Sequence, residues 1–292
     1  MLKAALIKYE LLLFFFEGLN MPFATSYKID DYESLLVALQ NVLGVIVPDS
    51  HRSHLVERIE PLLLSYKLNS FALLAEKLQS GDADVCVKVL DAISRRQAGW
   101  YLNPEAQNVL HKYIFAQLPD KAKIWLVGCG QGQLAYSVMM EIDKYERTSG
   151  QAKKFQLIAT DVLQDDINQA ELAIYNTQQL RTLRDDDVKR FFTLNEKTGS
   201  DQVKDKYRQQ ITFSQCSLIE GFQSLGQMDL IICPEVLVYF SSSVKAGIIQ
   251  QFAGVLNSGG IFLTGSNQAV IPFSEGFERV EHLAGVFYRK TD

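Results

Sequence analysis

The sequence predicts an α/β fold in which a small all-helical N-terminal domain precedes a doubly wound parallel sheet. Helical periodicity without any strand pattern extends from Asp30 to about Leu118, and short apolar runs alternating with helical segments follow it. The length of 292 residues fits two domains better than one core. The composition, with 47% hydrophobic and 22% charged residues, is that of a globular protein and excludes disorder and coiled coil.

The N-terminal domain is predicted to contain four helices. In the first, apolar residues recur at three- and four-residue steps from Tyr32 onward. Glycine, proline and serine separate the helical stretches, as is typical of helix ends and caps. The predicted helices lie between Asp30 and Gly44, after Pro48, between Ser70 and Leu78, and from about Ala83 to Ile93.

Residues 1–20 form an N-terminal extension with two interpretations. The apolar run Leu11–Phe16 is shorter than the roughly 20 residues that cross a bilayer, and it lacks the features of a signal peptide. The segment is either an additional amphipathic helix, or translation starts at Met21, which we favour. The helical domain then takes residues 21–98, and a linker with a connecting helix takes residues 99–118.

The remaining residues, 119–292, are predicted to form the sheet domain. Its apolar runs are continuous rather than alternating, as in a parallel sheet covered on both faces. A polar stretch near 193–213, which includes the alternating segment Gln210–Ser214, is interpreted as a small hairpin insert. The predicted strands are Lys123–Val127, Phe155–Thr160, Met228–Cys233 and Gly260–Thr264, and the helices between them are Leu134–Tyr145, Gln164–Ile174 and Val244–Leu256.

Two features at predicted strand ends indicate a nucleoside ligand. A glycine-rich turn at residues 128–132 (GCGQG) follows the first strand, where glycine permits a tight turn and a close approach of a ligand. Asp161 ends the second strand, where a carboxylate accepts hydrogen bonds from a ribose or caps the next helix. The turn lacks the Gly-Lys-Ser/Thr of a P-loop, so a dinucleotide or S-adenosylmethionine remains, and the GxGxG spacing favours S-adenosylmethionine.

Charge and cysteine content disfavour other classes of protein. The chain carries 29 basic and 34 acidic residues, a net charge of −5, whereas nucleic-acid binders usually show a basic excess. Cys86, Cys129, Cys216 and Cys233 form no CxxC pair, so we expect neither a disulfide framework nor a metal site. Free thiols fit a reducing cytoplasm, and we expect no membrane insertion.

An ordered series of short motifs extends through nearly the whole chain, from about Asp30 to Lys290. Ile124-Trp125 leads into the glycine turn, Tyr136-Ser137 follows it, and Gly259-Gly260 precedes the last predicted strand. In this pattern the sequence resembles the chemotaxis receptor methyltransferase (CheR-type) family. Members of that family pass a methyl group from S-adenosylmethionine to glutamate side chains of chemoreceptors.

The resemblance implies a class I methyltransferase with a Rossmann-like sheet. It implies a cytoplasmic enzyme of chemotaxis signal transduction that forms S-adenosylhomocysteine, uses no metal and acts on a chemoreceptor or another signalling protein. Tyr239 is implied to be the catalytic residue, which orients the acceptor or the methyl group. The implied cofactor-binding residues are Gly128, Gly130, Gly132, Gln133, Asp161, Ser217, Leu218, Glu235, Val236 and Arg96.

Several of these positions depart from the family pattern. The linker of the family carries an arginine where this chain has Leu102. Each lost hydrogen-bond partner would cost about 0.5–3 kcal/mol of binding, unless Arg96, Gln133 or Glu235 makes a substitute contact. The sequence therefore supports two hypotheses: a methyltransferase that acts on protein glutamates, or a degenerate, non-catalytic binding or scaffold module in a signalling complex. The other departures are Arg96 for asparagine and Ala98 for threonine in the linker, Gln133 for an acid, Ala135 for proline, Ser217 for asparagine and Pro234-Glu235 for arginine-asparagine.

Overall fold

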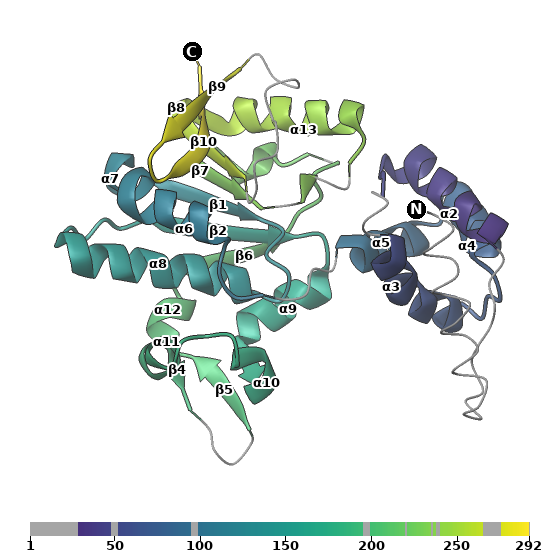
Figure 1. Cartoon of the computed structure of the whole chain (residues 1–292), viewed down its shortest axis with the longest axis horizontal. Helices are drawn as coiled ribbons and strands as arrows, with labels where there is room; N and C mark the ends of the chain where they lie inside the picture. The colour runs from purple at the N-terminus through teal and green to yellow at the C-terminus, as the bar shows by residue number, and fades with distance from the viewer. Residues whose placement is uncertain are drawn as a thin grey trace.

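The computed structural model describes residues 29–47, 52–94, 99–194, 199–219, 221–234, 236–237, 240–264 and 276–291. Figure 1 shows a group of helices beside a larger body in which helices cover a sheet. The expected extension at residues 1–20 lies outside the described residues. The proposed division of the chain at residues 98 and 119 stays a prediction.

The N-terminal helices form a group with a hydrophobic core of its own. Ser70 caps one of them, because its hydroxyl accepts a hydrogen bond from Leu73 N at 3.3 Å. Backbone atoms join this group to the larger body: Ser241 N donates to Gly44 O at 2.6 Å, and Val45 forms an antiparallel bridge with Phe240. The helices are α2 (Ile29–Leu43), α3 (Arg52–Ser65), α4 (Phe71–Gln79) and α5 (Ala83–Ser94).

The larger body contains a seven-stranded sheet in the order β6-β2-β1-β7-β8-β10-β9. The neighbouring strands β6, β2, β1, β7 and β8 are parallel, and β10 is antiparallel to both β8 and β9. The strands are β1 (Lys123–Val127), β2 (Gln156–Asp161), β6 (Ile211–Gln215), β7 (Met228–Cys233), β8 (Leu256–Thr264), β9 (Phe277–His282) and β10 (Gly285–Lys290).

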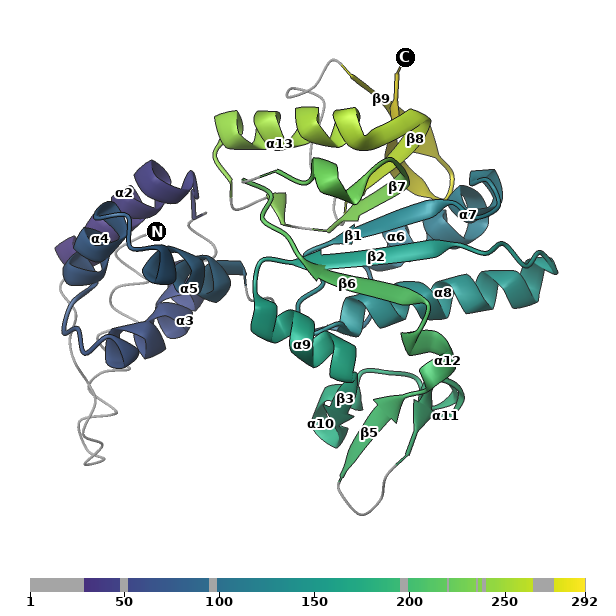
Figure 2. The same cartoon turned by 180° about the vertical axis from the view of Figure 1, so that it is seen from behind.

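Helices cover both faces of this sheet, as Figure 2 shows from behind. In β1, Ile124 and Leu126 belong to one core, whereas Trp125 and Val127 belong to the other, because successive side chains of a strand point to opposite faces. The predicted α/β, doubly wound architecture is thereby confirmed. The covering helices are α6 (Pro104–Val109), the π-helix η2 (Leu110–Ile114), α7 (Phe115–Gln117), α8 (Gln133–Ser149) and α9 (Gln164–Leu172) on one face and α13 (Ser242–Val255) on the other.

A second, three-stranded sheet with the order β3-β5-β4 lies beside α8 and α9. The insert expected near residues 193–213 differs from this small sheet at both ends. Four residues of the alternating segment Gln210–Ser214, from Ile211 onward, belong to β6, which pairs with β2 at the edge of the large sheet. The small sheet instead begins at Ile174, because α9 ends at Leu172 and Ala173 takes a left-handed conformation. Its elements are β3 (Ile174–Asn176), α10 (Thr177–Leu180), α11 (Asp185–Phe191), β4 (Phe192–Thr193), β5 (Ser200–Val203) and α12 (Asp205–Arg208).

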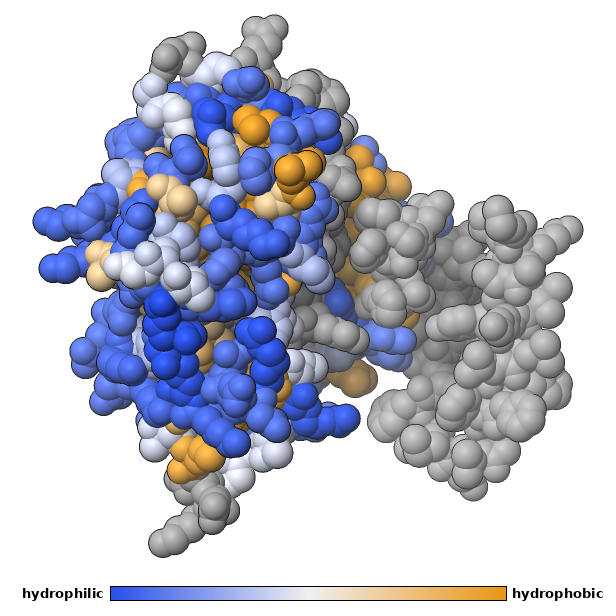
Figure 3. Space-filling model, turned by 60° about the vertical axis from the view of Figure 1, so that its left-hand side comes forward, coloured by the Kyte–Doolittle hydropathy of each residue, from blue (hydrophilic) through white to orange (hydrophobic). Residues whose placement is uncertain are grey.

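The surface in Figure 3 is mostly hydrophilic, and hydrophobic side chains on that face stand in small, separate groups. Leu172, Ile174 and Leu194, near the small sheet, are among the exposed large apolar residues. Isolated apolar side chains are normal on a protein surface. Among the described helices, none combines the length and the apolar composition that a bilayer crossing requires.

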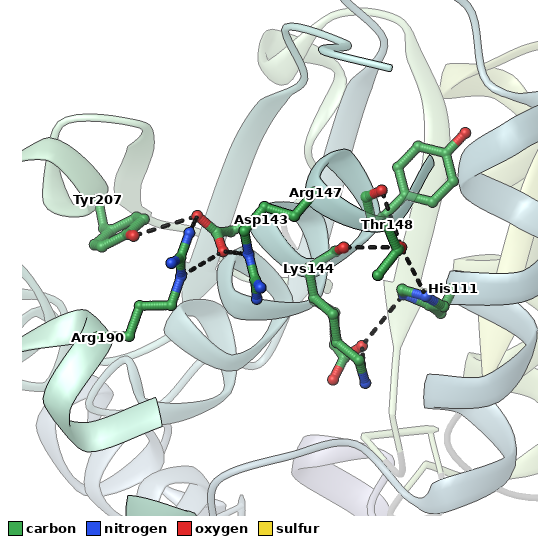
Figure 4. Close-up of polar contacts among 9 residues, drawn as sticks. His111, Asp143, Lys144, Arg147, Thr148, Arg190 and Tyr207 are labelled. Atoms are coloured by element: carbon green, nitrogen blue, oxygen red, sulfur yellow. Dashed lines mark hydrogen bonds and ion pairs between the residues drawn. The ribbon is translucent and has the colours of Figure 1, made fainter. Parts of the chain in front are cut away.

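An ionic network centred on Asp143 attaches the small sheet to α8 (Figure 4). The carboxylate accepts hydrogen bonds from Arg190 at 2.8 and 2.9 Å, from Arg147 at 2.8 Å and from the Tyr207 hydroxyl at 3.2 Å. Burial alone would raise the pKa of Asp143, but the bonds from Arg190 and Arg147 outweigh it and lower this pKa. The network therefore stabilises the fold with Asp143 ionised.

Asp143→Asn is expected to lower the free energy of unfolding by about 1–2 kcal/mol near neutral pH, a value reduced because both arginines are half exposed. The pKa of Asp143 is lower in the folded than in the unfolded chain, so this contribution is present above about pH 4 and disappears as pH falls further. Urea unfolding at several pH values measures it. The control, Asp186→Asn, changes an exposed aspartate of α11. A difference that persists unchanged at pH 3 contradicts the prediction.

Candidate functional site

The carboxyl ends of the parallel strands bring the predicted site residues to one edge of the sheet. Gly128 follows β1, Asp161 ends β2, Ser217 follows β6 and Val236 follows β7. After β1 the chain continues to β2, which is the neighbour of β1 on one side, whereas β7 is its neighbour on the other side. Such a switch in direction is where open α/β sheets bind ligands.

The glycine turn is packed against the protein at both ends, and a Cβ added in its middle meets no described atom. The amides of Gly128 and Cys129 both donate to Thr160 O, at 2.8 and 2.9 Å, so the turn is fixed to β2. Gly130 has a φ of 51°, and a Cβ added there meets no described atom within 4 Å. A Cβ added to Gly132, with a φ of 94°, lies 2.8 Å from the Cβ of Ala170. A ligand can therefore approach the backbone at Gly130.

Asp161 binds the glycine turn and the start of α9 at the same time. Its Oδ2 accepts a hydrogen bond from Gly130 N at 2.8 Å, and its Oδ1 accepts from Val162 N at 2.8 Å and Leu163 N at 3.4 Å. Burial, together with the charge of Asp166, raises the pKa of Asp161 despite these three donors. A carboxylate offers about four acceptor positions, so a hydroxyl donor of a ligand can still bind it. The ribose contact expected from the sequence stays a prediction.

The N-terminus of α8 faces the same turn. Its N-cap is Gly132, and no described side chain caps it. Gln133, the first residue of α8, is 2% exposed, and its side-chain Nε2 has no hydrogen-bond partner among the described residues. Free amides at a helix start and a buried donor without an acceptor both suit a ligand that carries acceptor oxygens.

The other predicted site residues are placed as follows. Leu218 is buried in the core on the α13 side, and Ser217 is partly buried next to Cys216, whose amide donates to Asp161 O at 2.8 Å. Val236 is partly buried, and its Cγ2 would lie 2.6 Å from a Cβ added to Gly128. The structure thus places Ser217 and Val236 at the same edge as the glycine turn. Arg96, Glu235 and Tyr239 lie outside the described residues.

The linker contributes two aromatic residues whose contacts the sequence did not reveal. The Trp100 indole Nε1 donates to Gln179 O at 2.7 Å. Tyr101 has a φ of 68°. Its amide donates a hydrogen bond to Ser137 Oγ at 3.0 Å, and its side-chain hydroxyl donates one to Asp187 at 2.8 Å. Leu102, at the position of the family's arginine, is 7% exposed and packs in the core. The linker is therefore bound to both α8 and the small sheet.

Comparison with known proteins identifies the family. The family model for the CheR methyltransferase, SAM binding domain, matches residues 86–285, which is more than half of the chain. The chain belongs to this family. It is a CheR-like, S-adenosylmethionine-dependent methyltransferase, as the sequence predicted.

This CheR-like chain is similar to chemotaxis methyltransferases over most of the length of both chains. Chemotaxis protein methyltransferase 1 of Pseudomonas aeruginosa is 28% identical over 267 residues, which is 89% of this chain and 97% of the relative. Chemotaxis protein methyltransferase 1 of Vibrio cholerae is 26% identical over 264 residues, 89% of this chain and 96% of the relative. The solved N-methyltransferase NodS of Bradyrhizobium japonicum with S-adenosyl-L-homocysteine is 15% identical, with a TM-score of 0.41, over 70% of this chain and 98% of that one.

The site of the CheR-like chain fits the cofactor of its family. A Cβ added to Gly130 meets no described atom within 4 Å, α8 begins at the end of the same turn without a described side-chain cap, and Gln133 carries a buried donor without a described acceptor. Asp161 retains acceptor capacity at the end of β2. In the described part of the chain, no group of three or more His, Cys, Asp or Glu residues is arranged to hold a metal ion.

Proposed function

We propose that the chain transfers a methyl group from S-adenosylmethionine to glutamate carboxylates of a chemoreceptor-like protein. One observation carries this proposal: the hydrogen bond of 2.8 Å between Gly130 N and the Asp161 carboxylate joins the glycine turn and the acid in a single site. The extensive match to chemotaxis methyltransferases supports the class of substrate.

The proposed cofactor contacts divide by chemistry. The turn at Gly128, Gly130 and Gly132 and the first amides of α8 approach the amino-acid portion, and Gln133 Nε2 donates to one of its oxygens. Asp161 accepts hydrogen bonds from the ribose hydroxyls.

Apolar and remaining polar contacts complete the proposed site. Leu218 and Val236 pack beside the adenine, as their burial near β6 and β7 suggests. Ser217, Glu235 and Arg96 are expected to meet the remaining polar groups. Tyr239 is expected to orient the acceptor or the methyl group.

When bound, the cofactor supplies a methyl group attached to a positively charged sulfur. The acceptor is a carboxylate, which is ionised near neutral pH, so the protein needs no general base. Its residues therefore act by binding, by orienting the acceptor and by excluding water. The buried Gln133 and the fixed glycine turn suit this role, because they hold their positions before the ligand arrives.

The proposed partner is a chemoreceptor or another signalling protein with glutamates in its acceptor region. We place the reaction in the cytoplasm, because the structure pairs none of the four cysteines in a disulfide, as is usual in a reducing compartment.

Calorimetry with S-adenosylhomocysteine, followed by transfer of a labelled methyl group to a candidate receptor, tests the proposed function. We expect saturable heat and label on the receptor, and the label should be absent from a receptor whose acceptor glutamates are replaced by alanine. If neither S-adenosylhomocysteine nor S-adenosylmethionine gives heat at millimolar concentration, the enzymatic proposal fails. The chain would then act as a non-catalytic binding or scaffold module of the same family.

A further inference from the structure

Four aromatic rings connect the glycine turn to the small sheet. Trp100 lies edge-to-face against Tyr175, with ring centres 5.0 Å apart, and against Phe192 at 5.5 Å. Tyr175 also lies edge-to-face against Phe192 at 6.4 Å and Tyr136 at 6.3 Å. Edge-to-face pairs at these separations are favourable and restrict ring orientation. Tyr175, which contacts each of the other three, therefore has a fixed ring position.

The hydroxyl of Tyr175 lies against two consecutive residues of the glycine turn. It donates a hydrogen bond of 2.7 Å to Gln131 O. It would also lie 2.9 Å from a Cβ added to Gly132, the N-cap of α8. The bond fixes the peptide group between Gln131 and Gly132, and this peptide directs the chain into α8. Tyr175 therefore determines where the first amides of α8 point.

Tyr175 keeps its hydroxyl proton near neutral pH and therefore stays a hydrogen-bond donor there. The residue is completely buried, and burial raises the pKa of its hydroxyl well above the usual value. Its neighbour Trp100 is itself anchored, since its Nε1 donates to Gln179 O at the end of α10. The small sheet and the linker thereby hold the Tyr175 ring from the side opposite the turn.

We propose that Tyr175 is a positioning residue of the cofactor site, which holds the turn at Gln131-Gly132 in the conformation that binds S-adenosylmethionine. This inference rests on the proposed function. Tyr175 acts through the backbone of the turn, and Trp100 acts through Tyr175. The small sheet is thus a structural part of the cofactor site although it lies beside α8 and not at the carboxyl edge of the large sheet.

The test compares Tyr175→Phe with Tyr136→Phe. Each change removes one hydroxyl from a buried ring. Tyr136 is the control because its hydroxyl donates a hydrogen bond of 2.8 Å to Ala170 O in α9 and not to a carbonyl of the turn. We expect Tyr175→Phe to raise the dissociation constant of S-adenosylhomocysteine about three- to tenfold, and Tyr136→Phe to leave it within twofold at a similar loss of thermal stability. In methyl transfer, Tyr175→Phe should raise the KM for the cofactor more than it lowers kcat.

Equal weakening by both variants in proportion to their loss of stability, or unchanged affinity in Tyr175→Phe, overturns the inference. If Tyr175→Phe does not fold, Trp100→Phe takes its place, since it keeps a ring but loses the bond to Gln179. If the unmodified protein binds no cofactor, the proposed function fails and amide hydrogen exchange decides separately. Faster exchange at residues 130–134 in Tyr175→Phe than in Tyr136→Phe then supports the positioning role, and equal exchange overturns it.

Discussion

Gly130→Ala is expected to weaken the binding of S-adenosylhomocysteine about tenfold to a hundredfold while lowering the free energy of unfolding by only about 1–2 kcal/mol. The stability loss is small because the new Cβ meets no described atom within 4 Å, so it costs only the strain of a φ of 51°. The loss of affinity is large because the methyl group occupies the space through which the ligand approaches the turn. Calorimetry and urea unfolding measure the two quantities separately.

Two other glycines provide the controls. Gly132→Ala places a Cβ 2.8 Å from the Cβ of Ala170 and 2.9 Å from the Tyr175 hydroxyl, so it should lower stability by several kcal/mol, about 3 or more. Gly81→Ala, in the turn between α4 and α5, has a φ of 76° and also meets no described atom within 4 Å. It carries the same kind of strain as Gly130→Ala and should leave binding unchanged. Normal affinity in Gly130→Ala would show that the cofactor does not lie against the turn.

Asp161→Asn is expected to lower the free energy of unfolding by about 2–4 kcal/mol in the absence of cofactor. The carboxylate accepts hydrogen bonds from Gly130, Val162 and Leu163 amides, whereas an asparagine has a single acceptor oxygen and directs its NH2 group at one of these donors. The backbone bonds of Gly128 and Cys129 to Thr160 remain, but the hold of the side chain on Gly130 and the start of α9 is weakened, so cofactor affinity should fall as well. Urea unfolding and calorimetry check the two effects.

A residue whose only role is to bind a ligand would leave the stability of the cofactor-free protein unchanged. Stability equal to that of the unmodified protein would therefore contradict the role of Asp161 as an anchor of the turn. Asp165→Asn is the matched control, because Asp165 is an exposed aspartate in the first turn of α9. It removes a charge near the same helix N-terminus and should change stability by no more than about 0.5 kcal/mol.

The sequence was sufficient for the parts of the site that follow buried strands. Lys123–Val127 and the run that ends at Asp161 are continuous apolar segments that stop at glycine or an acid, so their carboxyl ends could be assigned to one edge of the sheet. The parallel pairing of β1 with β2 then places Gly130 against Asp161. This part depended on local patterns and on the rule that joins parallel strands.

The remaining features depend on contacts between distant segments. Trp100 and Tyr175 are separated by 75 positions in the chain, and no local pattern indicates that their rings meet at 5.0 Å. The segment at Gln210–Ser214 alternates like a half-buried strand, which fits a hairpin as well as the edge position that β6 occupies. Strands β9 and β10 were not predicted. They form an antiparallel pair at the far edge of the sheet, outside the alternation of strands and helices on which the prediction depended. Such features require the pairing partner to be known.

Main-chain atoms contribute to the junction between the helical group and the larger body. Ser241 N bonds Gly44 O, Val45 pairs with Phe240, and a side chain at Gly44 would collide with Val244. Main-chain pairing does not depend on which side chains the two segments carry, apart from the requirement for glycine. The outer faces of the helical group can therefore change through evolution, and with them its choice of partner, while its attachment next to the segment that follows β7 is preserved.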